Sequence, residues 1–258
     1  MTICFADIET SAIPSSGVLD VSEIHCIAVK SGDLDTLCYT SRFLPIPNYG
    51  GTLQNGLDYI NKHDIVLFHN YTFDVVVLEQ LLGEVTATPL DTMILAKLIY
   101  TSDELMELDY TLPNMPKALY GRFSLEAFGH RVGLHKGDYS DWSRLTVAMT
   151  TYCTNDVEVT YHLYHSLQNA SNYPSQDTID LEHEVAYIVA QQTHYGFYFD
   201  LDSARTLQQK LMYEKLSIEL RLAKTFRPLF LAVSGGTTIP AKPRRNKLYI
   251  EDNHYVGF

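Results

Sequence analysis

Two residue patterns follow one another along this chain of 258 residues, and their order limits the folds open to it. Short apolar segments rich in β-branched residues predict strands at 2–8, 24–29 and 65–68, and a shorter strand at 37–39. The strands at 2–8, 24–29 and 37–39 suggest a β-meander. From about residue 92 onward, apolar residues recur mainly at helical spacing. Strands first and helices later indicate an α/β fold.

The predicted helices share an apolar face and polar flanks, and they occupy residues 53–62, 72–82, 92–100, 124–132, 144–168, 177–195 and 202–226. A short strand-like segment at 196–200 separates the last two. The polar stretch 169–175 contains Pro174 and is the best candidate for a boundary between modules. We therefore predict one domain over residues 1–168 and a helical extension over 169–258.

The charge is distributed unevenly. The net charge of −12 argues against a protein that holds nucleic acid by a broad basic surface. Residues 203–247 nevertheless carry ten basic side chains and two acidic ones. These charges are either solvated helix faces or contacts to a phosphate backbone, and the sequence leaves both interpretations open.

Several classes of protein are excluded by what the sequence lacks. No apolar run approaches the roughly 18 residues of a membrane span, and the N-terminus has no basic signal-peptide region. We expect a cytoplasmic protein, in the host cytoplasm if a phage encodes it, without a membrane partner. The four cysteines lie far apart and without zinc-site spacing, so we interpret them as reduced core or surface thiols.

Two acids stand two residues apart within the first apolar segment. Because side chains alternate along a strand, Asp7 and Glu9 point to the same side of the predicted sheet. Their mutual repulsion is relieved by a cation, and hard divalent ions prefer such oxygen ligands. A solvated strand end is the simpler explanation for this pair considered alone.

Two further segments carry acids with an ambiguous role. Tyr152 and Asp156 lie four residues apart and share one face of the predicted helix 144–168. Asp74 follows Asn70 and Phe73 at a strand-to-helix corner, where ligand sites often occur in α/β folds. Alternatively, Asp156 faces outward from its helix, and Asp74 is a first-turn acid that complements the helix dipole.

In combination, these three short motifs resemble those of the DEDD superfamily of 3′-to-5′ exonucleases, in its tyrosine-containing branch. The resemblance implies a ribonuclease H-like mixed β-sheet flanked by helices, followed here by a helical C-terminal extension. It implies that Asp7, Glu9, Asp74 and Asp156 bind two divalent metal ions, Mg²⁺ or Mn²⁺, and that Tyr152 orients the attacking water. We also assign Asn70 and Phe73 to substrate binding, although an aromatic side chain is more often part of a core.

Longer strings at residues 89–98, 124–133 and 136–139 resemble the proofreading domain of family A DNA polymerases of the T-seven-like podophage group. The likeness continues through 180–184 and 196–200 into the start of that family's polymerase region. The polymerase catalytic residues of the family lie several hundred residues further on, so we expect no polymerase activity. A truncated chain and a separate subunit of a split polymerase both fit, and the second implies a separately encoded polymerase portion as partner.

The expected activity is hydrolysis of 3′-terminal phosphodiesters of single-stranded or frayed DNA, releasing nucleoside monophosphates. Two alternatives stay open. One is a ribonuclease D-like exonuclease that processes RNA, which would share the acids and differ in how it receives the 2′-hydroxyl. The other is an assembly subunit that completes a polymerase and whose nuclease is incidental.

Overall fold

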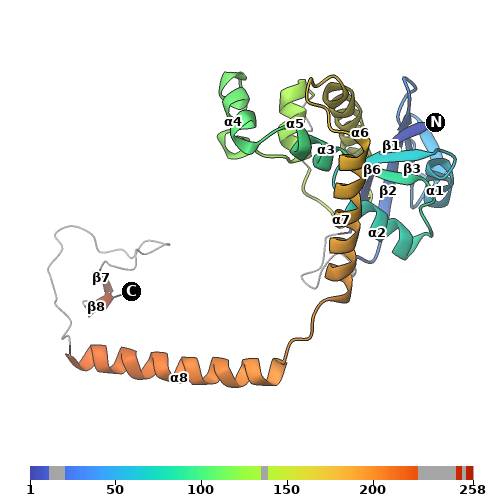
Figure 1. The fold of residues 1–258 in the computed structure, drawn as a ribbon. Helices are drawn as coiled ribbons and strands as arrows, with labels where there is room; N and C mark the ends of the chain where they lie inside the picture. The colour runs from blue at the N-terminus through green and yellow to red at the C-terminus, as the bar shows by residue number, and fades with distance from the viewer. Residues whose placement is uncertain (12–20, 135–138, 226–247, 252–253, 258) are drawn as a thin grey trace. The chain divides into compact units, whose positions relative to one another are not determined.

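The computed structural model describes residues 1–11, 21–134, 139–225, 248–251 and 254–257. The chain forms two compact units, Met1–Gly196 and Phe197–Phe258. A mixed sheet of six strands lies at the centre of the first unit, in the order β4-β3-β2-β1-β5-β6 (Figure 1). The strands are β1 (Ile3–Thr10), β2 (Ile24–Ser31), β3 (Leu37–Thr40), β4 (Tyr49–Thr52), β5 (Ile65–Phe68) and β6 (Thr88–Asp91).

The first three strands form the predicted antiparallel meander, whereas β5 and β6 add in parallel beyond β1. The pairings of β5 with β1 and of β6 with β5 use crossover connections that contain α1 and α2, whereas β4 pairs in parallel with β3 after a loop without a helix. The helices of this unit are α1 (Leu53–Ile60), α2 (Tyr71–Leu81), α3 (Thr92–Ile99), α4 (Ser102–Thr111), α5 (Leu125–Val132), α6 (Val147–Gln168) and α7 (Gln176–Tyr195). The structure thus confirms the α/β class.

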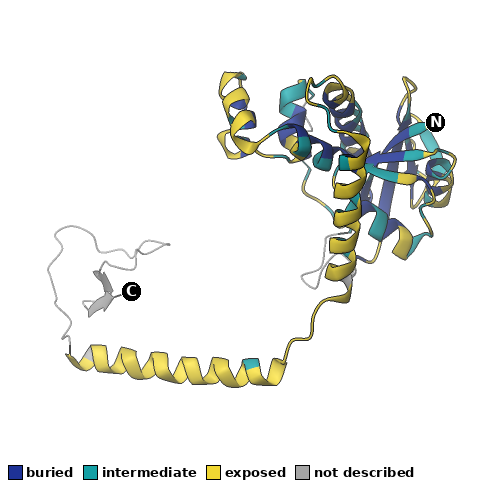
Figure 2. Ribbon diagram, viewed as in Figure 1, coloured by how far each residue is buried: buried dark blue, intermediate teal, exposed yellow. Residues whose placement is uncertain are grey.

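Each face of the sheet is covered by its own set of helices. Helices α3, α5 and α6 bury one apolar cluster with Phe5 of β1, and α1 and α2 bury the other with Ile8. Figure 2 shows the buried strands between these helices. Because β1 is central and alternates between the two clusters, its side chains are fixed on both faces.

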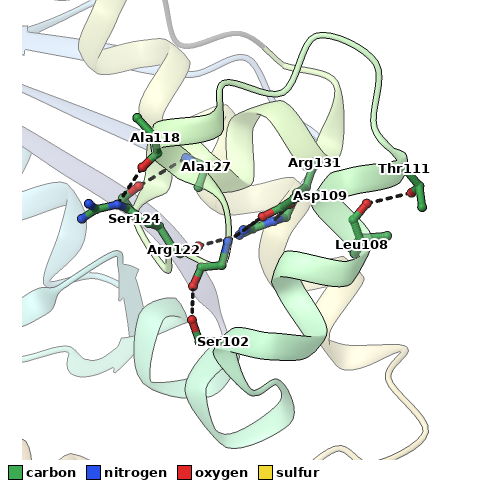
Figure 3. A network of polar contacts seen from close by, with 10 residues as sticks. Ser102, Leu108, Asp109, Thr111, Ala118, Arg122, Ser124, Ala127 and Arg131 are labelled. Atoms are coloured by element: carbon green, nitrogen blue, oxygen red, sulfur yellow. Dashed lines mark hydrogen bonds and ion pairs between the residues drawn. The ribbon is translucent and has the colours of Figure 1, made fainter.

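A polar network joins α4 to α5 at one end of the unit (Figure 3). Arg131 donates two hydrogen bonds to the buried carboxylate of Asp109, at 2.8 and 2.7 Å, and the N–H of Gly121 donates a third at 2.8 Å. Ser102 and the carbonyl oxygen of Arg122 extend the network. The carboxylate is thereby fully hydrogen-bonded, which buried charge requires.

Helix α7 belongs to the first compact unit, so the predicted domain boundary after residue 168 falls within that unit. Ile179 and Ala186 of α7 contact the clusters on the two sides of the sheet. The second unit contains α8 (Leu201–Thr225) and the antiparallel pair β7 (Leu248–Glu251) and β8 (His254–Gly257). Several apolar side chains of α8 are more than half exposed, namely Leu207, Leu211, Met212, Leu216, Ile218 and Leu220.

Some elements differ from expectation. The strand predicted at 196–200 is wrong, because these residues form no strand and have no ladder partner. Strands β4 and β6 and helix α4 were not predicted. The basic residues Arg227, Lys242, Arg244, Arg245 and Lys247 lie outside the described residues, as do residues 136–138 of one family-like string. Within the part of the chain that the structure describes, no helix is both long and apolar enough to cross a membrane.

Candidate active site

Strand β1 presents two acids toward α6. Asp7 lies opposite Ala28 of β2, and Glu9 lies opposite Cys26, so both carboxylates leave the sheet on the same side, as predicted. Asp7 is partly buried and Glu9 is buried. A carboxylate oxygen of each acid and the Sγ atom of Cys153 all lie within 4.8 Å of one another. The strand therefore supplies two oxygen ligands at one point.

Helix α2 brings a third acid to the same point. Asn70 adopts a left-handed conformation (φ 78°, ψ 52°) directly after β5, and α2 begins at the next residue. Asp74 follows in the first turn and is buried, and it accepts hydrogen bonds from its own N–H and from the N–H of Ile8. Burial and then the negative charge of Asp7 raise the pKa of Asp74 well above its ordinary value. The two acids are thus close enough to repel each other.

Helix α6 carries the fourth predicted acid and the predicted tyrosine. Thr146 caps this helix by accepting a hydrogen bond from the N–H of Met149, and the helix then packs across β1 and β2. Tyr152 and Asp156 lie on one face of it, and Asp156 is 2% exposed. The ring of Tyr152 packs edge-on against Trp142, with 5.7 Å between the ring centroids.

Cys153 is a member of this site that the sequence analysis did not identify. Its buried thiol donates weak hydrogen bonds to the backbone oxygen and to Oδ2 of Asp7, both at 3.5 Å. Burial, and then the charges of Asp7 and Glu9, raise the pKa of the thiol well above its ordinary value. It is a reduced, buried thiol, as expected, but nothing in its sequence context indicated its proximity to the acids.

The two residues assigned to substrate binding are placed differently from each other. Asn70 is exposed at the corner, whereas Phe73 is partly buried against the cluster of α1 and α2. His69, next to the motif, hydrogen-bonds Thr92 at 2.9 Å and the carbonyl oxygen of Phe123 at 2.8 Å. The roles of Asn70 and Phe73 stay predictions, and His69 has structural partners.

The donor set fits divalent cations. Three sequence segments more than 60 residues apart place carboxylates around one end of β1 and the facing side of α6. Carboxylate oxygens are the preferred ligands of Mg²⁺ and Mn²⁺, and a cation would offset the repulsion that raises the pKa of Asp74. The thiol of Cys153 departs from an all-oxygen set, and it donates a weak hydrogen bond to Asp7.

Comparison with known proteins identifies the family. The model of a family described as 3′-5′ exonuclease matches residues 43–172, which is half of the chain. The chain belongs to this 3′-5′ exonuclease family. The matched residues include Asp74, Tyr152 and Asp156, whereas β1 with Asp7 and Glu9 precedes them and α7 follows them. The family typically uses divalent metals, in agreement with the donor set of the site.

Two relatives of the exonuclease are phage polymerases. The DNA-directed DNA polymerase of Escherichia phage T7 is 26% identical over 94% of this chain, and that of Enterobacteria phage T3 is 26% identical over 73%. The chain spans only 40% and 33% of the length of these two proteins. The predicted resemblance to phage family A polymerases is therefore confirmed, and it covers a minor part of each relative.

A solved structure shares the fold of the exonuclease. A nuclease in its apo form superimposes with a TM-score of 0.51 at 19% identity, covering 77% of this chain and 88% of that one. This agreement supports the ribonuclease H-like arrangement of a mixed sheet flanked by helices. At this level of identity the likeness concerns the fold alone.

Proposed function

We propose that the chain is a metal-dependent 3′-to-5′ DNA exonuclease of proofreading type, which hydrolyses 3′-terminal phosphodiesters of single-stranded or frayed DNA and releases nucleoside monophosphates. The observation that carries this proposal is the proximity of Asp7 to Asp74 and to Cys153, which lies next to Tyr152 and three residues before Asp156 on α6. The family match supplies the reaction class, and this proximity supports the choice of residues for it.

In this proposal Asp7, Glu9, Asp74 and Asp156 hold two divalent ions, Mg²⁺ or Mn²⁺. Such ions stabilise negative charge on the attacking and leaving oxygens of a phosphodiester and lower the pKa of bound water. The chain's own task is to position them. Asp7 and Glu9 are fixed by the central strand, and Asp156 is fixed by the helix that packs on it. Tyr152 orients the attacking water through its hydroxyl, while its ring is held against Trp142.

The acidic charge of the chain is compatible with a polyanionic substrate. Bound cations are the largest local charges in such a site, so they attract a terminal phosphate where a basic surface is lacking. The exposed Asn70 lies at the corner that carries Asp74, where it can donate to the terminal nucleotide, and Phe73 is the proposed stacking residue. DNA is the favoured substrate because both relatives are named DNA-directed DNA polymerases.

A second role is favoured by the exposed apolar side chains of the C-terminal helices. Leu181, Val185 and Ile188 of α7 are about half exposed or more, and α8 exposes a longer series. Apolar surface of this kind marks protein interfaces. We propose that a separately encoded polymerase portion covers it, so that exonuclease and polymerase assemble from two chains. This chain would then not polymerise DNA by itself.

The experiment is digestion of a 5′-labelled single-stranded DNA and of the matching RNA, with Mg²⁺, with Mn²⁺ and with EDTA. We expect a metal-dependent ladder that shortens from the 3′ end, on DNA more than on RNA. Asp7→Ala should abolish the ladder. Asp103→Ala, which removes an exposed acid of α4, is the matched control and should leave the ladder unchanged.

Each other outcome of the digestion has a definite meaning. Faster cleavage of RNA would make the chain a ribonuclease D-like enzyme. Full metal-dependent activity of Asp7→Ala would mean that the site is wrongly assigned. Cleavage that requires an added polymerase portion would favour the assembly subunit.

A further inference from the structure

Helix α7 contacts the corner that carries Asp74, although it lies beyond the residues that the family model matches. The contact is made by His183. The N–H of Asp91 donates to Nε2 of His183 at 2.8 Å, and Nδ1 of the same ring lies 2.7 Å from the carbonyl oxygen of Ile179. A carbonyl can only accept, and a backbone N–H can only donate, so the ring is neutral with its proton on Nδ1.

Tyr71 makes the second link between α7 and the corner. Its hydroxyl donates to the carbonyl oxygen of His183 at 3.1 Å, and the two rings stack with 5.9 Å between their centroids and 22° between their planes. Tyr71 is the first residue of α2 and is buried, and Asp74 follows it by three residues. The side chain and the backbone of His183 are thus both joined to the segment that begins α2.

Asp91 transmits the contact to the backbone of the corner. Its Oδ1 atom accepts from the N–H of Asn70 at 2.9 Å and from the N–H of Met93 at 2.7 Å. Its Oδ2 atom accepts from the N–H of Tyr71 at 3.0 Å. One buried carboxylate therefore holds the start of α2 and the start of α3 together, and His183 holds the N–H of the same residue.

The left-handed backbone of Asn70 makes the corner dependent on these contacts. Residues other than glycine adopt this conformation uncommonly, asparagine most often among them, and contacts with the surrounding structure stabilise it. The hydrogen bonds from Asn70 and Tyr71 to Asp91 do so here. If the end of β6 moved, the first turn of α2 and the carboxylate of Asp74 would move with it.

We propose that His183 is a positioning residue of the exonuclease: through Asp91 and Tyr71 it holds the corner that directs Asp74 toward Asp7, so that α7 is part of the active nuclease and more than a connection to further domains. This inference rests on the proposed function for its catalytic consequence. Its structural consequence, a corner stabilised by α7, can be measured without any nuclease activity.

The test compares His183→Leu with His183→Gln in the full chain. Glutamine can present an oxygen acceptor to the N–H of Asp91 and leucine cannot, while both remain compatible with a helix. Glu182→Gln is the control, because this side chain is exposed on the same helix. The readouts are kcat and KM on single-stranded DNA, the melting temperature, and amide hydrogen exchange of peptides that cover 69–74 and 88–93 in metal-free buffer.

For His183→Leu we expect kcat to fall about tenfold with little change in KM, since displacing a reacting group by about 1 Å costs up to roughly a hundredfold in rate. Exchange should accelerate in the two corner peptides and stay unchanged in β1 and β2. His183→Gln should recover most of both losses, and the Glu182→Gln control should match the wild type.

Three outcomes would overturn the proposal: no change in His183→Leu, equal losses in both His183 variants, or faster exchange throughout the unit with a lowered melting temperature. If the wild type cleaves no nucleic acid, the proposed function fails. In that case the exchange data alone still decide whether His183 holds the corner.

Discussion

The Sγ atom of Cys153 on α6 lies 3.5 Å from both the backbone oxygen and Oδ2 of Asp7 on β1. This contact joins the helix that carries Asp156 to the strand that carries Asp7. Asp156 is three residues beyond Cys153 on the same helix, so the contact couples this part of α6 to Asp7.

The buried thiols should be unreactive in the folded protein. Burial raises the pKa of Cys4 to about 12, and burial together with the charges of Asp7 and Glu9 raises the pKa of Cys153. The thiolate is the nucleophile, so iodoacetamide at pH 8 should modify none of the four cysteines that the structure shows as buried. Mass spectrometry should find four modifications in denaturant. Rapid labelling of Cys153 without denaturant would contradict its placement.

Asp74 should make the metal-free protein less stable as the pH rises. Its pKa is raised on folding above the ordinary 3.8, so from about pH 4 up to the raised pKa the folded state holds a proton that the unfolded state has released. The free energy of unfolding therefore decreases through that window. Asp74→Asn removes this dependence. In EDTA at pH 7 the free energy of unfolding of the variant should exceed that of the wild type by more than the roughly 0.5 kcal/mol typical of surface substitutions.

Urea unfolding of both proteins between pH 4 and 7 checks this prediction. The difference in free energy of unfolding between the two proteins should shrink toward pH 4, where Asp74 is protonated in the folded wild type. Saturating Mg²⁺ should stabilise the wild type and not the variant, because a cation bound to the folded state adds to stability. Parallel pH curves for the two proteins in EDTA would show that Asp74 ionises normally.

Tyr152→Phe should slow hydrolysis about a hundredfold and leave metal binding intact, because it removes the hydroxyl and keeps the ring. The packing of that ring can be followed directly, since Trp142 is the single tryptophan of the chain and contacts it edge-on. Tryptophan emission should be the same in Tyr152→Phe as in the wild type and should shift in Tyr152→Ala. Calorimetric titration with Mn²⁺ tests the binding. Wild-type rates in Tyr152→Phe would exclude a role for the hydroxyl.

The pair of Asp109 and Arg131 should contribute to stability in a strongly non-additive way. Arg131→Met leaves the fully buried carboxylate of Asp109 without its two strongest donors, and such a loss costs about 3–5 kcal/mol. The double variant Asp109→Leu with Arg131→Met should recover most of it, because no uncompensated charge remains. Urea unfolding measures all three proteins. Additive losses would mean that the two side chains contribute independently.

The sequence predicted the parts of the fold in which the local pattern and the tertiary structure agree. Strands β1 and β2 are long and rich in β-branched or apolar residues, and α6 has a clear helical period. The sequence predicts a turn in place of strand β4, because Gly50 and Gly51 occupy half of it and its parallel pairing with β3 is not a local feature. Strand β6 contains Pro89, which is tolerated because this strand is at the edge of the sheet. Helix α4 did leave a signal, the capping box of Thr101 and Glu104.

The sequence likewise predicted only some of the residues of the candidate site. Asp7 and Glu9 were predicted on one side of a strand from their spacing alone, and the structure places them there. The proximity of Asp74 to Asp7 follows from the parallel pairing of β1 with β5, which no local pattern encodes. Cys153 and His183 leave no signal, because a cysteine or histidine within a helix is as compatible with a core as with a site. Their contacts arise only when separate elements pack.

Strand β1 lies between β2 and β5, and both of its faces are covered by helices. Its amides can therefore exchange with solvent only when the sheet itself opens. Two of the four acids thus sit in the part of the molecule that is expected to open last, whereas Asp74 lies on α2, whose start is held by hydrogen bonds to Asp91. Heating should accordingly leave Asp7 and Glu9 in place as long as β1 stays paired.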